Sequence, residues 1–190
     1  MSSLEIPGYT AGTWTVDPVH SEVGFVVRHL MVSKVRGGFT SFEGTITTAP
    51  DPLRSTVAAS VDLTSITTNN EQRDAHLRSA DFLNTEGDPK MTFRSTALRP
   101  GGSGLVCEGD LTIRGITHPV SLDVEVNGIG PDPYGGTRLG VSASGQINRA
   151  DYGVNWNAAL EGGGVVVSDK VQLVLEIQAV LDKATSPGAP

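Results

Sequence analysis

Residues 105–114 read LVCEGDLTIR, and apolar and polar side chains alternate along the whole stretch. One face of the segment carries Leu105, Cys107, Gly109, Leu111 and Ile113. Residues 120–126 and 170–181 repeat the same pattern, with Val, Leu and Ile opposite Ser, Asp, Glu and Gln. A period of two is typical of antiparallel strands with one buried and one solvated face. These segments therefore predict an all-β protein.

Weaker alternation and turn sequences divide the rest of the chain. The further strand candidates are residues 13–17, 21–30, 37–48, 55–64, 90–98 and 137–149. Gly/Pro-rich turns such as RPGGSG (99–104) and GPDPYGG (130–136) separate the strands. About eight antiparallel strands in one domain favour a closed barrel or a sandwich.

Small residues on the apolar faces favour a barrel that contains a ligand. Those faces include Ala59, Ser95, Ala97, Cys107, Gly109, Ala143 and Gly145, and aromatic residues make up only 5% of the chain. A solid core needs bulky side chains to reach the usual packing density, whereas an eight-stranded barrel can enclose one small molecule. We expect a ligand cavity; the alternative is a flattened barrel with a filled core that acts only as an interaction scaffold.

One segment has the character of a helix. It lies near residues 69–83, within SITTNNEQRDAHLRSADFL (65–83), with Thr68 or Asn69 as the candidate N-cap. Asp74 and Arg78 are spaced to form an i,i+4 pair. Arg73 and His76 are then left either to brace the helix against the barrel or to contact a ligand.

Composition limits the classes of function. The chain has 190 residues, a net charge of -7 and one cysteine. This balance argues against a general nucleic-acid or anionic-membrane surface, and a single cysteine excludes an internal disulfide. No apolar run approaches the length of a membrane span, and the first residues show no secretory signal, so a cytoplasmic location is expected. The expected layout is an N-terminal extension (1–12), one barrel domain (13–182) and a disordered tail (183–190).

Catalytic and metal sites are weakly indicated. Asp17, His20 and Ser21 have the residue types of a nucleophilic triad, but nearly adjacent residues do not place the base between the other two. Asp17 is better explained as a turn former. A long-range metal site from His20, His29 and His76 stays open, although no close ligand pair is present.

Three other residues have structural interpretations. Arg149 and Asp151 are expected to tie a strand end to its turn by a salt bridge. His118 precedes a proline and is expected in an exposed turn. Cys107 is expected to face inward as a small apolar side chain.

Four blocks of sequence resemble one family. They are WTVDPVHSEVGFVVRHLMVSKVRGGFTSFEGTI (14–46), SITTNNEQRDAHLRSADFLNTEGDPKMTF (65–93), CEGDLTIRGITHPVSL (107–122) and INRADYGVNW (147–156). Their order and spacing resemble those of the YceI-like proteins over nearly the whole chain. The resemblance implies an extended, lipocalin-like antiparallel barrel with an apolar tunnel for a polyisoprenoid chain, and frequently a homodimer.

Together these observations predict non-catalytic binding, transport or storage of a long-chain isoprenoid or quinone-like lipid. The partner is thus a small lipid, with no nucleic acid, no stable membrane insertion, no metal and no cofactor, and a homodimer stays open. The alternative is a metal-dependent or histidine-based enzyme acting on a hydrophobic substrate. The predicted tunnel lining is Val23, Phe25, Val27, Phe39, Phe42, Ala59, Val61, Phe93, Cys107, Gly109, Leu111, Val141, Ala143 and Gly145. The predicted head-group contacts are His29, Arg73 and His76.

A neutral or weakly polar head group is expected, because the nearest cations are not directed inward. Arg28 alternates with the inward residues of its predicted strand and is therefore expected to point outward. Lys34 and Arg36 are expected in an exposed connection.

Overall fold

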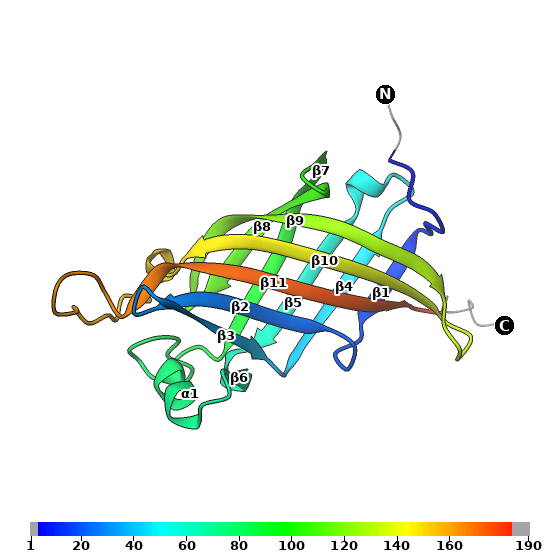
Figure 1. Ribbon diagram of the computed structural model, residues 1–190. Helices are drawn as coiled ribbons and strands as arrows, with labels where there is room; N and C mark the ends of the chain where they lie inside the picture. The colour runs from blue at the N-terminus through cyan, green and yellow to red at the C-terminus, as the bar shows by residue number, and fades with distance from the viewer. Residues whose placement is uncertain (1–3, 184–190) are drawn as a thin grey trace.

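The computed structural model describes residues 4–183, which form one long, curved sheet with a short helix below one end (Figure 1). The strands are β1 (Gly12–Val16), β2 (Glu22–His29), β3 (Ser33–Phe39), β4 (Phe42–Thr48), β5 (Thr56–Asp62), β6 (Ile66–Thr67), β7 (Lys90–Gly101), β8 (Gly104–Ile113), β9 (Ile116–Pro131), β10 (Thr137–Asn148) and β11 (Val167–Leu181). The helix is α1 (Glu71–Arg78), and short 3-10 turns occupy Pro52–Arg54, Leu63–Ser65 and Arg149–Tyr152. All pairings between strands are antiparallel.

The sheet closes on itself through β1. This strand pairs with β4 along one edge and with the end of β11 along the other. β1 and β2 both pair with β11, so together they act as one long interrupted strand. β3 pairs with β2 and β4 pairs with β1, so β3 and β4 act as a second interrupted strand. β5 and β6 form a third interrupted strand, since β5 pairs with β4 and β6 with β3. The result is an eight-stranded, lipocalin-like closed barrel with one helix, and the predicted fold is confirmed.

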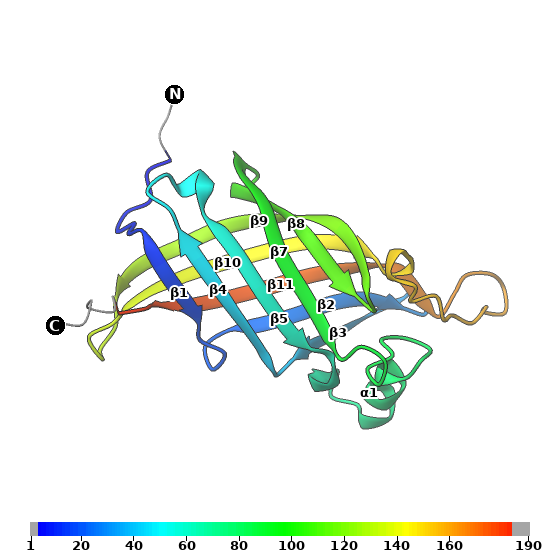
Figure 2. The ribbon, with the colours of Figure 1, turned by 180° about the vertical axis from the view of Figure 1, so that it is seen from behind.

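Buried side chains concentrate in two clusters. At the closure, Trp14 is fully buried with Leu139 and Ala179, and its indole N–H donates to Thr48 Oγ1 at 2.9 Å. The larger cluster contains Leu63, Phe82, Cys107, Leu111, Ile113, Val120, Leu122, Tyr152 and Val154. Figure 2 shows the wall that β1, β4, β5, β7 and β8 build across the back of the barrel.

Two predicted connections are strands in the structure. Lys34 and Arg36 are exposed as predicted, but they lie on β3, where they pair with Arg28 and Val26 of β2, and not in a connection. His118 lies on β9 and packs edge-on against Tyr152 at 5.4 Å, rather than in an exposed turn. The turn that precedes His118 is only two residues long and consists of Arg114 and Gly115. Both residues take positive φ, which suits a hairpin turn of this length.

The helix is shorter and differently capped than predicted. Asn70, not Thr68 or Asn69, is the N-cap, and its side-chain oxygen accepts a bond from the Arg73 N–H at 2.9 Å. The helix ends at Arg78, where the Ser79 hydroxyl donates to the carbonyl of His76. None of the helices among residues 4–183 has the length and apolar character needed to cross a membrane.

The β1–β2 turn is tied to the β9–β10 end by an ionic cluster. Asp17 Oδ2 lies 2.8 Å from Arg138 Nη1 and 2.7 Å from His20 Nδ1, while Asp132 Oδ2 accepts from Arg138 Nε at 3.1 Å. Asp17 also accepts the N–H of Val19, as predicted for a turn former. The three candidate triad residues do not form a catalytic relay, because the hydroxyl of Ser21 donates to the carbonyl of Gln178 instead.

This cluster predicts a specific pH dependence. The hydrogen bond from Arg138, followed by that from His20, lowers the pKa of Asp17 below its ordinary value. Since the folded-state pKa is the lower one, the stabilisation is complete above the unfolded pKa of about 4 and is lost as pH falls from there. Arg138→Met should therefore give a shallower decrease of unfolding free energy between about pH 5 and pH 3, measured by urea unfolding.

Asp132 should retain most of its own contribution in that variant, because the N–H of Gly136 is the main cause of its lowered pKa. Arg54→Met is the matched control, since Arg54 has no carboxylate partner among residues 4–183. Equal slopes for Arg138→Met and the parent would contradict the assignment.

Candidate functional site

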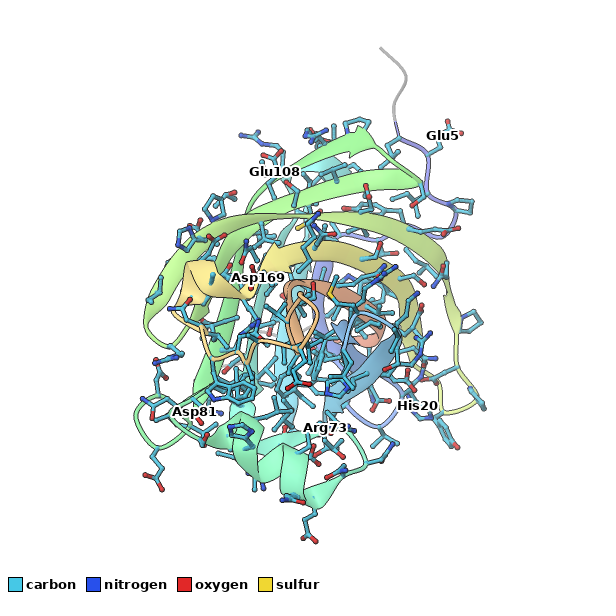
Figure 3. All side chains as sticks on the ribbon, turned by 60° about the vertical axis from the view of Figure 1, so that its left-hand side comes forward. Glu5, His20, Arg73, Asp81, Glu108 and Asp169 are labelled. Atoms are coloured by element: carbon cyan, nitrogen blue, oxygen red, sulfur yellow. The ribbon has the colours of Figure 1, made fainter. Side chains whose placement is uncertain are left out.

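A cavity of about 750 Å³ runs inside the barrel. Inward-facing aliphatic and aromatic side chains from the strands form its wall, since strand alternation directs every second residue to the interior. Ile6 and Tyr9 lie at one end of the cavity, and His76 and Trp156 lie at the other. Figure 3 views the barrel from the α1 end, with Arg73 near the rim.

Most of the predicted lining residues lie on this wall. They are Val23, Phe25, Val27, Phe39, Phe42, Ala59, Val61, Phe93, Cys107, Leu111, Val141 and Ala143. Gly109 and Gly145 point inward but lie behind the wall, because larger side chains cover them. A Cβ on Gly109 would collide with the Phe93 ring, and a Cβ on Gly145 would lie 2.7 Å from the Leu122 side chain. These glycines make room for neighbouring side chains instead of widening the cavity.

The N-terminal extension contributes to the end of the cavity opposite the helix. The Tyr9 hydroxyl donates to the carbonyl of Ala49 at 2.7 Å and lies 3.0 Å from Ser55 Oγ. Ile6 and Tyr9 both line the cavity. Residues 1–3 of the predicted extension and residues 184–190 of the predicted tail lie outside the described residues.

Arg73 braces the helix to the strand that precedes it. Its Nε donates to Thr68 Oγ1 at 2.7 Å, and its Nη2 donates to the Thr68 carbonyl at 2.9 Å. Asp74 is buried and accepts bonds from the N–H and the hydroxyl of the same threonine. The predicted Asp74–Arg78 pair is therefore wrong: a buried carboxylate takes the nearby threonine donors. Arg73 also lies on the cavity wall.

His76 closes the same end of the cavity. Its Nε2 lies 2.9 Å from Asp81 Oδ2, and its ring packs edge-on against Phe82 at 5.0 Å and Trp156 at 4.8 Å. His29, the third predicted polar contact, also lines the cavity, at the end of β2. The structure thus brings all three predicted polar residues to the α1 end.

Arg149 organises the loop that carries Trp156. Its Nη1 donates to the carbonyls of Val154 and Trp156, both at 2.9 Å, and its Nε donates to the carbonyl of Ser168. The side chain is buried, which lowers its pKa, and the nearest carboxylate is Asp169 at 3.6 Å. The predicted salt bridge with Asp151 is wrong, because the guanidinium faces inward to the loop carbonyls.

The histidines lie in separate surroundings. His20 is beside Asp17, and His76 is beside Asp81. Among residues 4–183, no group of three or more His, Cys, Asp or Glu side chains is arranged to hold a metal ion. Cys107 is buried on the cavity wall, and burial raises the pKa of its thiol to about 11, so the thiolate is scarce at neutral pH.

A closed antiparallel barrel around an apolar cavity places the chain in the class of lipocalin-like β-barrels. Within that class the chain belongs to the YceI-like family, because the YceI-like domain matches residues 14–179.

Three known proteins illustrate the relationship. A UPF0312 protein of Staphylococcus epidermidis is 42% identical over 168 residues, covering 87% of this chain and 96% of that protein. The crystal structure of the YCEI protein of Campylobacter jejuni has a TM-score of 0.70 at 27% identity and covers 94% of this chain and all of that one. A polyisoprenoid-binding domain from Saccharophagus degradans has a TM-score of 0.68 at 16% identity, covering 91% of this chain and 100% of that one, and shares the fold.

Tyr152 offers a test of the packing beside the cavity. Within residues 4–183, its hydroxyl is the one buried side-chain polar atom without a hydrogen-bond partner, and burial raises its pKa to about 12. An unpaired buried hydroxyl costs roughly 1–3 kcal/mol. Tyr152→Phe should therefore leave the unfolding free energy equal to or above that of the parent, as measured by urea unfolding.

Tyr9→Phe is the matched control, because it removes a hydroxyl that is hydrogen-bonded. That variant should lose about 1 kcal/mol. If Tyr152→Phe lost as much as Tyr9→Phe, the Tyr152 hydroxyl would have a partner in solution and the explanation would fail.

Proposed function

We propose that this protein binds a long-chain isoprenoid or quinone-like lipid in the barrel cavity and acts as a non-catalytic carrier or store. The observation that carries the proposal is the cavity of about 750 Å³ with an almost wholly apolar wall. This volume lies within the range of roughly 300–1,000 Å³ that is usual for small-molecule pockets. The Saccharophagus degradans domain of the same fold is described as polyisoprenoid-binding, which supports the choice of ligand class.

The energetics favour a flexible hydrocarbon tail. Burial contributes about 0.8 kcal/mol for each CH₂ group, so several isoprene units outweigh the cost of ordering the chain. The wall carries few groups that could hydrogen-bond along the tail, since aliphatic and aromatic residues dominate it. Selectivity would therefore depend on cavity length and on the polar end.

The head group would lie at the α1 end. His29, Arg73 and His76 line that end together with Arg28 and Arg149, whereas Tyr9, Thr48 and Ser55 line the opposite end. Arg73 already donates to Thr68, and His76 already pairs with Asp81. Because Arg73 and His76 are engaged at the helix and Arg149 at backbone carbonyls, a neutral quinone or prenol head fits better than a pyrophosphate, which needs several uncommitted donors.

Non-catalytic binding is supported by how the candidate catalytic groups are used. Ser21 is bonded to Gln178, and the Cys107 thiol has a raised pKa. The histidine-based or metal-dependent enzyme and the filled scaffold stay the alternatives that an experiment must distinguish. The cytoplasmic location and the homodimer stay predictions from the sequence.

The direct test is mass spectrometry of an organic-solvent extract of purified protein, with elemental analysis of the same sample. We expect a stoichiometric long-chain isoprenoid or quinone and no stoichiometric metal. A metal with turnover of a hydrophobic substrate would indicate the enzyme instead. A protein that carries no lipid and binds no added prenol would indicate the scaffold.

Filling the cavity should reduce binding. Ala143 is buried on the wall, so Ala143→Phe would extend a ring into the space that a tail needs. Displacing the equivalent of two CH₂ groups costs about tenfold in affinity for a long-chain prenol. Fluorescence or calorimetric titration of the delipidated protein measures the change.

Ser144→Phe is the control, because Ser144 is exposed on the outer face of the same strand, β10. Its affinity should match the parent's. A folded Ala143→Phe protein that bound prenol as tightly as the parent would show that the ligand lies elsewhere.

A further inference from the structure

The turn between β2 and β3 exposes three consecutive apolar side chains. Leu30, Met31 and Val32 are 40%, 53% and 87% exposed. Leu30 and Met31 have φ values of 53° and 61°, a region that bulky residues rarely adopt. The Leu30 N–H donates to the carbonyl of Val166 at 2.8 Å, which holds the turn in this conformation. The exposure is therefore a property of a fixed turn.

A second loop lies against this turn. Residues 160–165 include Gly162, Gly163 and Gly164, all with positive φ, and the exposed Val165. The hydrogen bond from Leu30 to Val166 holds the two segments side by side, and a Cβ built on Gly164 would lie 3.5 Å from Met31. They project together from one end of the barrel, at the left of Figure 1. We call residues 30–32 and 160–165 the loop tip.

Three exposed cations follow the loop tip along the β2–β3 hairpin, and one of them, Arg28, also borders the cavity. Arg28 is directly opposite Lys34, and Arg36 is opposite Val26 one step further along the same face. All three are exposed, and none forms a salt bridge or a side-chain hydrogen bond with another part of residues 4–183. Like charges directly across a strand pair are destabilising. The hairpin thus keeps an unpaired positive face in a chain of net charge -7.

The acidic groups near the tip do not cancel this face. Glu161 lies in the loop tip, and Asp169 lies 3.6 Å from the buried Arg149. Lys170, next to Asp169 on β11, adds another exposed cation. The local balance is positive, opposite in sign to that of the whole chain.

The cavity reaches the same end of the barrel. Its wall includes His29, Val35 and Val166, which flank the loop tip. Only Gly38 and Phe39 of β3 pair with β6, so residues 33–37 have no neighbouring strand on their outer edge. Strand pairing therefore does not complete the wall along residues 33–37, next to the tip.

We propose that the loop tip docks the protein on an anionic lipid bilayer. Apolar side chains flanked by cations are the combination that binds the interface of such a bilayer, with the apolar groups among the head groups and the cations on the phosphates. The net charge of the whole chain argues against binding to an anionic membrane. Charges further apart than a Debye length of about 10 Å are largely screened, so the charge of the local face decides instead. The purpose of docking is exchange of the ligand with the membrane, and in this respect the proposal rests on the proposed lipid-binding function.

The test is flotation of the full-length protein with vesicles of phosphatidylcholine alone and of equal parts phosphatidylcholine and phosphatidylglycerol. We expect binding to the anionic vesicles that weakens with added salt. Replacing Arg28, Lys34 and Arg36 together by Gln should lower the partition coefficient by about two orders of magnitude, since each cation near the surface contributes about 1 kcal/mol. Met31→Asn with Val32→Ser should lower it by about tenfold; Asn tolerates the positive φ at position 31.

The matched control is Val19→Ser with Tyr134→Ser, which removes the two exposed apolar side chains near the Asp17–Arg138 cluster at the other end of the barrel. Its vesicle binding should equal the parent's. Equal loss in this control, no binding of the parent, or binding that is indifferent to salt would each overturn the proposal. So would a dimer, seen by light scattering, that the Met31/Val32 changes dissociate, because a second copy would then cover the tip.

Prenol titration without vesicles separates this proposal from the proposed function. Prenol binding without vesicle binding would overturn docking and leave the carrier function intact. Vesicle binding without prenol binding would support docking and overturn the carrier function.

Discussion

The structure depends on the pairing of one short strand with two partners. β1 forms ladders with β4 and with the end of β11, and this closes the sheet. Closure satisfies the backbone groups of both edges, and it also fixes the interior as a space that inward side chains must fill. Trp14 fills that space at the closure itself, with its N–H bonded to Thr48. Further along the barrel Tyr152 and Leu63 are fully buried in the larger cluster, and the cavity occupies the interior between the inward side chains.

The polar interactions that shape the cavity are confined to its ends. Arg149 holds the loop with Trp156, Thr68 links Arg73 and Asp74, and Tyr9 holds the N-terminal segment at the opposite end. Such bonds are strengthened where water is excluded, and each would be costly if left unpaired. Placing them at the ends leaves the wall apolar.

Strand alternation made the wall predictable, because inward direction follows from parity once the strand is known. This is why Phe25, Cys107 and Ala143 could be assigned to the interior from local sequence alone. The wrong predictions concern residues whose partners are distant in sequence, or residues whose position depends on the conformation of a turn. Arg149 bonds backbone carbonyls up to 19 residues away, and nothing adjacent to it signals this. Strand alternation also could not show that larger neighbouring side chains cover Gly109 and Gly145. Asp74 had two local partners available, and burial rather than spacing decided between them.

The net charge of the chain is likewise a poor guide to how one part of its surface interacts. A net charge of -7 describes the whole chain, yet Asp17 and Asp132 share Arg138 in one ion-paired cluster, while Arg28, Lys34 and Arg36 share a face without acidic partners among residues 4–183. A surface interacts through its own potential, which decays over a Debye length and does not sum the far side of the molecule. The two ends of the barrel therefore differ in kind: one is tied by ion pairs, and the other presents apolar loops beside unpaired cations and the cavity.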